Sequence, residues 1–409
     1  MKKTVLKQYA RLIAGTGANV QKGQAVVIRA ELDQPEFVKT LVHECYRAGA
    51  SEVAVEWEHQ PLTKLHVRYQ KPAVLGKVDK WEEMRLRHRA ETLPAMIYLE
   101  SADPDGLNGI DQGKWAGGTR SRQKVIKPIR DTMDNKYQWC IAAVPGEKWA
   151  KKMFPELSAG KAVERLWEAI LYTSRADGTD PIKAWEMHNA DLKHRCEHLN
   201  SLNLKTLIYK AGNGTDLRVG LIPDSRFLAG AETTLGTGVV YNPNIPSEEV
   251  FISPMKGEAE GIVYSSRPLA FRGVLIENFS IRFENGRAAE VHAEKNEEAL
   301  RTIISMGDGS DMLGECALVP HNSPISNSGL MFYNTLFDEN AACHLALGSG
   351  FTNCLDGYER YTLEECRAKG INDSIIHEDF MIGTPDLAIT GIRRNGEQAE
   401  IFRSGNWAF

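Results

Sequence analysis

The sequence lacks the features that mark several large classes of protein. No uninterrupted apolar run approaches the ~18 residues of a membrane span. The chain begins Met-Lys-Lys, and no apolar segment of the kind found in signal peptides follows. No G-x-G-x-x-G or Walker A pattern follows a strand-like segment, so a nucleotide-binding role has no support. We therefore expect a cytoplasmic protein with no membrane partner.

Cysteine and excess basic charge are also scarce. Seven cysteines in 409 residues, at scattered spacings and without a C-x-x-C pair, do not make a disulfide framework, so we expect reduced thiols. A net charge of -5 gives no basic footprint for nucleic acid. In the basic stretch from Lys77 to Arg89, acidic residues are interspersed, as on a solvated helix face. We expect no nucleic-acid partner.

The composition is that of a globular protein, with 42% hydrophobic and 25% charged residues, and the length suggests two domains. In the first half, helix-like and strand-like segments alternate, which predicts a parallel sheet covered by helices. Helices are expected at Val5–Ala14 and Phe37–Ala48, and strands at Gln24–Arg29, Ser51–Trp57, Ala95–Leu99 and Trp139–Val144.

The pattern changes after the turn-rich stretch Ala176–Pro181. Strands joined in part by Gly-Asn-Gly and Glu-Asn-Gly hairpin turns become frequent. They are expected at Leu204–Tyr209, Asp216–Gly220, Gly261–Tyr264, Ile276–Phe283 and Arg287–His292. The sequence thus predicts an α/β domain with a parallel sheet over residues 1–195. A mainly antiparallel, β-rich domain is predicted over residues 196–409.

Three candidate metal-ligating residues lie in two strand-like stretches in the last third of the chain. His377 and Asp379 are two residues apart within Ser374–Ile382, so a strand would place both on one face. Glu315 lies in Gly314–Val319, where it shares a face with apolar neighbours. A carboxylate on an apolar face is costly unless it is paired or bound to a metal. A hydrogen-bonded pair or a surface pair remains the simpler interpretation of His377 and Asp379 alone.

Two further positions are less certain from spacing. His344 is expected on a short helix over Asp338–Leu347, with Asp338 as its N-cap and Gly348 as its stop. A lone helical histidine is more often a core residue than a ligand. Glu248 and Glu249 are adjacent, so only one of them can face a site. Imidazole and carboxylate groups together suit zinc, cobalt or manganese, and a pair of such ions suits hydrolysis.

A second cluster competes for the same interpretation. His194-Arg-Cys-Glu-His198 fits the H-x-x-E-H pattern, in which two histidines four apart on a helix can bind zinc. No third ligand can be identified by spacing. A solvent-facing helix between the domains is the simpler interpretation.

Three strings together resemble the M29 family of metallo-aminopeptidases over essentially the full length of the chain. They are N-I-P-S-E-E-V-F from Asn244, L-F-D-E-N-A-A-C-H-L-A-L-G ending at Gly348, and H-E-D-F-M-I-G from His377. The resemblance implies an N-terminal α/β domain, a C-terminal β-rich, cylinder-like domain that carries the metals, and a homodimer enclosing a cavity. It also implies substrates that are peptides with a free N-terminus.

The resemblance further implies two divalent ions per chain, which would be zinc, cobalt, manganese or magnesium. Glu249 is preferred to Glu248 because its distance along the chain from Glu315 matches the family spacing. Glu315 is also the residue expected to assist proton transfer. The ligands that carry over are Glu249, Glu315, His344, His377 and Asp379.

One position departs from the family pattern. Seven residues after His344, where the family has a tyrosine that assists catalysis, this chain has Phe351. A phenol can donate a hydrogen bond to a developing oxyanion, and losing one such donor typically lowers turnover by about 10²–10³. Tyr358 lies downstream as a possible replacement. Two other functions therefore stay open: a non-haem iron oxygenase that uses two histidines and one carboxylate, and a non-catalytic peptide-binding protein.

Overall fold

The computed structural model describes all 409 residues, which divide into two compact units. Unit 1 consists of Met1–Ala190 and Gly230–Ser247, and unit 2 consists of Asp191–Ala229 and Glu248–Phe409. The chain therefore leaves unit 1, returns to it over residues 230–247, and then enters unit 2 again. No helix is both long and apolar enough to cross a membrane.

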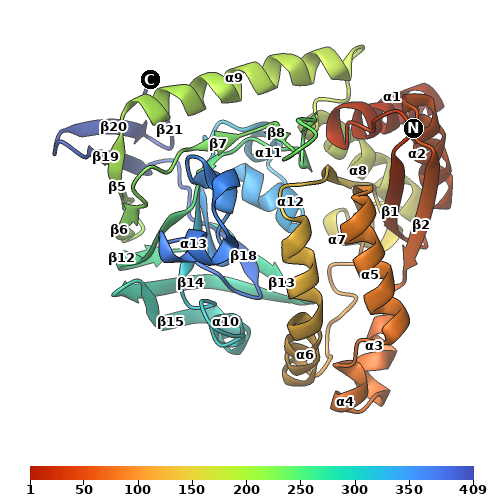
Figure 1. Cartoon of the computed structure of the whole chain (residues 1–409), viewed down its shortest axis with the longest axis horizontal. Coiled ribbons are helices and arrows are strands. Elements are labelled where there is room, and N and C mark those ends of the chain that lie inside the picture. Colours follow the sequence, from red (N-terminus) through yellow and green to blue (C-terminus); the bar gives the residue numbers. More distant parts are fainter. The chain divides into compact units, whose positions relative to one another are not determined.

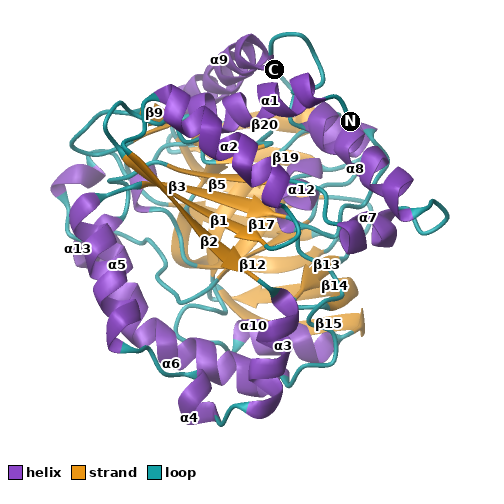
Figure 2. Ribbon diagram, turned by 90° about the vertical axis from the view of Figure 1, so that its right-hand side faces the viewer, coloured by secondary structure: helices purple, strands orange, loops and turns teal.

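Unit 1 is built on a five-stranded sheet with the order β10-β4-β3-β1-β2. Every neighbouring pair is parallel, and β1, β2 and β3 lie side by side in Figure 2. This confirms the predicted parallel sheet, and four strands fall where the sequence places them. The strands are β1 (Ala25–Glu31), β2 (Glu52–Glu58), β3 (Ala95–Glu100), β4 (Trp139–Ala143) and β10 (Asn244–Ile245).

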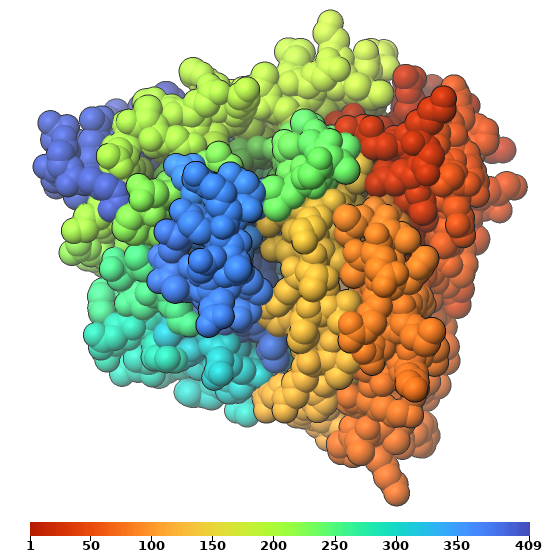
Figure 3. Space-filling model, viewed as in Figure 1, coloured from red at the N-terminus to blue at the C-terminus, as the bar shows by residue number.

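Several helices of unit 1 bury one apolar face, among them α1, α2 and α8. In α2, Phe37, Val38, Leu41 and Cys45 are buried, and the helix ends at Gly49 with a φ of 112°. In Figure 3 the orange and amber segments show α5 and α6 at the surface. The helices of unit 1 are α1 (Lys3–Leu12), α2 (Pro35–Ala48), α3 (Gln60–Tyr69), α4 (Pro72–Leu75), α5 (Lys80–Thr92), α6 (Gln112–Arg130), α7 (Glu147–Met153) and α8 (Ala159–Thr173), and α9 (Pro181–Ser201) continues into unit 2.

Unit 2 contains a nine-stranded antiparallel sheet with the order β13-β14-β12-β6-β5-β19-β20-β21, and β15 pairs with β14. The hairpin of β14 and β15, seen in Figure 1, turns at Asn285 and Gly286, both of which have positive φ as a tight hairpin requires. The predicted antiparallel organisation is confirmed. The strands are β5 (Leu204–Lys210), β6 (Asp216–Leu221), β12 (Pro254–Tyr264), β13 (Leu269–Phe271), β14 (Val274–Glu284), β15 (Arg287–Lys295), β19 (Ala388–Arg393), β20 (Gln398–Arg403) and β21 (Asn406–Trp407).

A second antiparallel sheet of unit 2 has the order β18-β17-β16-β11-β7. Residues from both sheets share one apolar core, to which β16, β17 and β18 contribute Cys316, Leu345 and Phe380. The strands are β7 (Leu228–Ala229), β11 (Val250–Ile252), β16 (Leu313–Leu318), β17 (His344–Gly348) and β18 (His377–Met381). The helices of unit 2 after α9 are α10 (Glu297–Ile304), α11 (Pro324–Asn327), α12 (Thr335–Asp338), the 3-10 turn η3 (Glu339–Ala341) and α13 (Leu363–Ala368).

The helix predicted over Asp338–Leu347 is wrong. The chain forms α12 and η3 there and then becomes strand β17, which begins at His344 and pairs with β16 and β18. All five residues of β17 are buried. A strand buried on both faces shows no alternation of polar and apolar residues, so its sequence cannot be distinguished from a short buried helix.

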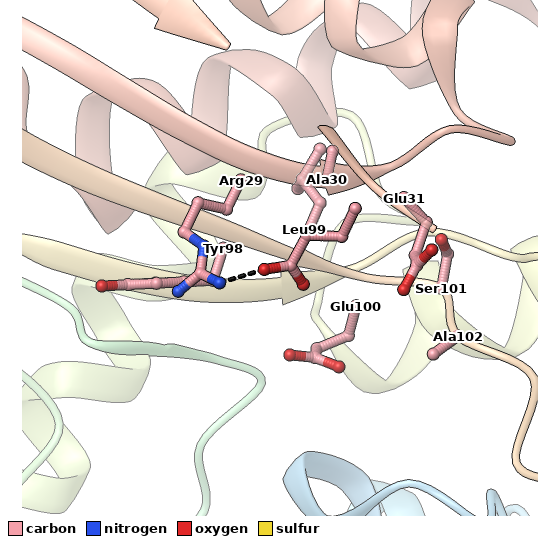
Figure 4. Close-up of a pocket in the computed structure, with 9 residues that line it drawn as sticks. Arg29, Ala30, Glu31, Tyr98, Leu99, Glu100, Ser101 and Ala102 are labelled. Atoms are coloured by element: carbon pink, nitrogen blue, oxygen red, sulfur yellow. Dashed lines mark hydrogen bonds and ion pairs between the residues drawn. The ribbon is translucent and has the colours of Figure 1, made fainter. Parts of the chain in front are cut away.

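A pocket of about 150 Å³ lies in unit 1 at the ends of β1, β2 and β3 (Figure 4). Arg29 forms an ion pair with Glu58 there and lies over the ring of Tyr98, 5.7 Å from its centroid. Glu31 and Glu100 share the pocket. Burial, and then the negative charges of Glu58 and Glu31, raise the pKa of the Glu100 carboxyl.

Replacing Glu100 by Gln should stabilise the protein at alkaline pH. A carboxyl whose pKa is raised on folding destabilises the folded state once it ionises, and this penalty is absent below the pKa of the unfolded chain, at about pH 4. We expect E100Q to raise Tm at pH 8 and to leave it almost unchanged near pH 4. The exposed substitution Glu91→Gln is the control, and equal gains at both pH values would contradict the assignment.

Candidate metal centre

The register of the second sheet of unit 2 aligns three side chains in one row. Glu315 on β16 is opposite Ala346 on β17, and Ala346 is opposite Asp379 on β18. Residues directly opposite each other in an antiparallel pair project from the same face. His344 and His377 lie two residues before Ala346 and Asp379, so they join that face. The alternate residues of these strands project into the core.

Ala346 occupies the middle of this row and is completely buried. Its methyl group separates the strand positions of Glu315 and Asp379. A larger side chain here would extend into the space between the two carboxyl groups. The small residue therefore places only a methyl group between the strand positions of Glu315 and Asp379.

The five residues that the sequence singled out meet in one place. His344 Nε2 lies 3.3 Å from a Glu249 oxygen, and His377 Nε2 lies 3.1 Å from a Glu315 oxygen and 3.2 Å from Asp379 Oδ1. Their ligand atoms form two groups, each within 4.8 Å: Glu249, Glu315 and His344, and Glu315, His377 and Asp379. Glu315 belongs to both groups and therefore joins them into one cluster.

Backbone carbonyls fix the orientation of both imidazoles. His344 Nδ1 donates to the carbonyl oxygen of Glu339 at 2.9 Å, and His377 Nδ1 donates to that of Ser349 at 2.7 Å. Each ring therefore turns its Nε2 toward the carboxyl groups. This is the usual arrangement of metal-ligating histidines, in which an outer hydrogen bond sets the tautomer.

The charges of the cluster shift the pKa values of its members strongly. Burial raises the pKa of Glu315 to about 7, although its hydrogen bond with His377 opposes the shift. Burial lowers the pKa of His344, but the hydrogen bond and charge of Glu249 outweigh it and raise that pKa to about 10. Burial also raises the pKa of Asp379, yet the neighbouring His377 outweighs it and lowers that pKa. The imidazoles thus take the compensating positive charge.

The donor set fits divalent metal ions. Asp379 Oδ1 is buried and accepts no hydrogen bond, although His377 Nε2 lies 3.2 Å from it. A buried carboxylate oxygen without a donor is costly, and a metal ion would satisfy it. Three carboxylates and two imidazoles in two overlapping groups suit zinc, cobalt or manganese.

Sequence reasoning missed Glu339. This residue is only 8% exposed, and its carboxyl group is hydrogen-bonded to Asp379. Burial, and then the charges of Asp379 and Glu249, raise its pKa well above the ordinary value. The signal that could have indicated it is the acidic pair Asp338-Glu339, five residues before His344. The expected helix accounted for Asp338 as its N-cap. Glu339 is a sixth candidate ligand.

Phe351 lies against the cluster. Its ring centroid is 5.0 Å from that of His377 and 5.2 Å from that of Phe251, and its backbone N–H donates to Ser253 Oγ at 2.7 Å. Tyr358 packs instead with a separate apolar cluster that includes Leu355. The ring of Phe351 thus packs on His377, which is 28% exposed, whereas the imidazole of His344 is buried.

The competing histidines lie elsewhere. His194 and His198 are on α9, and neither belongs to a group of residues that could hold a metal ion. His194 is exposed, while the ring of His198 stacks on Phe409 with centroids 3.9 Å apart. This is the solvent-facing helix of the simpler interpretation.

The fold and this cluster describe a metal-dependent hydrolase, and comparison with known proteins specifies the family. Residues 2–407 match the family described as thermophilic metalloprotease (M29). Aminopeptidase AmpS of Bacillus subtilis is 39% identical over 99% of this chain and 98% of its own. Aminopeptidase 2 of Geobacillus stearothermophilus is 37% identical, again over 99% and 98% of the two chains.

Solved structures agree with this result. Wild-type AmpT from Thermus thermophilus superposes with a TM-score of 0.89 at 36% identity, and all of both chains is covered. The chain belongs to the thermophilic metalloprotease family M29. A 2,5-dihydroxypyridine dioxygenase from Pseudomonas putida gives a TM-score of 0.50 at 11% identity over 99% of this chain and 96% of that one, a likeness of fold alone.

Metal binding should stabilise the protein through this cluster. A ligand present at 100 times its Kd stabilises the folded state by about 2.7 kcal/mol per site. We expect zinc or cobalt added to chelator-treated protein to raise Tm, and His377→Ala to remove most of this rise. The matched variant His194→Ala should keep it. A rise that depends on His194 and not on His377 would place the metal on α9.

Proposed function

We propose that this protein is an aminopeptidase that releases N-terminal residues from peptides with the help of two divalent metal ions. Glu249, Glu315, His344, His377 and Asp379 are the proposed ligands. The observation that carries the proposal is Glu315, which belongs to both groups of candidate ligands. The relatives support the peptidase activity, since proteins 36–39% identical over nearly the whole chain are aminopeptidases.

Two bound ions would supply an acidified water and would polarise the scissile carbonyl group. The residues of the chain have the remaining tasks. The Glu315 carboxyl belongs to both groups of candidate ligands, so it lies close to any water held there and is the residue we propose to assist proton transfer. His344 and His377 are held by backbone carbonyls, so they need not reorganise. The acidic rim of the cluster would attract the α-ammonium group of the substrate.

The first test is release of the N-terminal residue from an unblocked peptide by metal-loaded protein. We expect cleavage that is lost on chelation and absent for the N-acetylated peptide. Glu315→Gln should lower kcat by about 10²–10⁴, the usual contribution of a general acid or base. Glu248→Gln is the matched control. It changes the glutamate next to Glu249 and should keep activity. Near-normal turnover by E315Q would refute the role of Glu315.

Metal content separates this function from the oxygenase alternative. Two zinc-like ions per chain agree with the peptidase, whereas one iron per chain agrees with a site of two histidines and one carboxylate. In that case Glu249 and Glu315 would have no ligand role. The likeness to the dioxygenase concerns the fold and does not favour that chemistry.

Phe351 limits the proposed activity without abolishing the site. Its ring lies beside His377, where the family tyrosine would present a hydroxyl group. Tyr358 packs instead against the separate apolar cluster that includes Leu355. We propose that this chain works with one hydrogen-bond donor fewer at the developing oxyanion.

Phe351→Tyr should therefore raise kcat, by on the order of 10²-fold if the hydroxyl acts on the oxyanion. The ring keeps its packing on Phe251 and His377, so KM should change little. Phe351→Leu, which removes the ring without adding a donor, is the control and should give no increase. An unchanged kcat in F351Y would show that this chain does not need the hydroxyl.

We also propose a homodimer, which the family resemblance implies. Its support in the structure is a set of large exposed apolar side chains in unit 1. Leu62, Leu65 and Tyr69 follow helical spacing on α3 and are 50%, 45% and 75% exposed. Trp81 and Met84 on α5 are 60% and 67% exposed. Exposed apolar surface of this kind is typical of interaction sites.

A further inference from the structure

Asn340 lies in η3, between Glu339 and the start of β17, and is completely buried. Its side chain makes three hydrogen bonds. Oδ1 accepts from the backbone N–H of Glu248 at 2.7 Å. Nδ2 donates to the carbonyl oxygen of Leu336 at 2.9 Å and to the carboxyl of Glu339 at 3.3 Å. One buried amide therefore joins the segment of Glu248 to the continuous stretch formed by α12 and η3.

Both segments bear on the candidate metal centre. Glu248 immediately precedes Glu249, so the bond to its N–H fixes the backbone from which the Glu249 side chain projects. Glu339 carries a candidate ligand carboxyl, and its carbonyl oxygen holds the imidazole of His344. The group formed by Glu249, His344 and Glu315 thus has two of its three members oriented through Asn340 or its neighbour.

Only an amide of this length satisfies all three partners. The Glu248 N–H needs an acceptor, while the Leu336 carbonyl and the Glu339 carboxyl need donors. An aspartate here would keep the first bond, lose both donors and place a second carboxyl beside Glu339. A leucine of similar size would leave the buried Glu248 N–H without an acceptor, which is a costly state.

We propose that Asn340 is a positioning residue that sets the affinity of the ion held by Glu249 and His344. This inference rests on the proposed two-metal site and deepens it. Asn340 acts through the direction of Glu249 and through the backbone of Glu339, whose carbonyl oxygen holds the imidazole of His344. The ion held by His377 and Asp379 depends on it less, because those residues are anchored on β18 and by the carbonyl of Ser349.

The test is metal titration of chelator-treated full-length protein by calorimetry with zinc. The wild type should bind two ions. Asn340→Leu should weaken one of them by about 10–100-fold, which is usual when an outer-shell partner of a metal site is removed. The other ion should bind nearly as before. Asn340→Asp, which keeps the bond to the Glu248 N–H, is the second variant and should weaken the same ion.

Two controls separate positioning from a general loss of stability. Asn242→Leu removes a buried amide of unit 1 that bonds to Asn189, and it should leave both affinities unchanged even if Tm falls. In a double-mutant cycle, N340L should have a smaller effect on metal binding once Glu249→Gln has removed one of the residues that it orients.

The outcomes are distinct. Wild-type protein that binds fewer than two ions would overturn the proposed two-metal function itself. Wild-type protein that binds two ions, together with folded N340L that binds both with unchanged affinity, would overturn only the role of Asn340. A loss of affinity equal in the presence and absence of the Glu249 carboxylate would overturn it as well. If N340L does not fold, the same comparisons are made with N340D.

Discussion

Carboxyl groups that are buried side by side repel one another and lose their hydration. The cluster in unit 2 must therefore have a source of compensating positive charge. Glu249, Glu315, Glu339 and Asp379 are each no more than 9% exposed, within reach of the imidazoles of His344 and His377. Without metal ions, the negative charge of these carboxyl groups is reduced by protonation and balanced by charged imidazoles. Divalent cations would compensate for it more completely. The arrangement persists because the opposite face of the same strands lies in the apolar core.

The sequence carries much of this structure wherever the local pattern is simple. The parallel sheet of unit 1 follows from alternating helix-like and strand-like segments, and the β14–β15 hairpin follows from its Asn-Gly turn. The period of two places His377 and Asp379 on one face, as observed. The position of His344 was misjudged because β17 is buried on both faces, and Glu339 was missed because it lies in a turn. Glu249 could not be separated from Glu248 by pattern alone, because the contact that fixes it comes from Asn340.

Fold and chemistry separate clearly in this protein. A dioxygenase that is 11% identical shares the architecture to a TM-score of 0.50, so the architecture alone does not specify peptide hydrolysis. In this chain the candidate site is a small set of side chains on one sheet face, with Ala346 between the strand positions of Glu315 and Asp379. Phe351 lacks the hydroxyl group of the family tyrosine, yet all five candidate ligands are present in this chain.

The return of residues 230–247 to unit 1 has a consequence for how such a protein can evolve. Ile245 pairs with Ala142 in the parallel sheet, and only four residues later the chain reaches Glu249 at the metal centre. The edge strand of one unit and a candidate ligand of the other are therefore encoded by the same short stretch of gene. Exchange of either unit by recombination would need breaks near residues 190, 229 and 247 together. A single crossover would separate a strand from its sheet, so the two units are expected to be inherited as one.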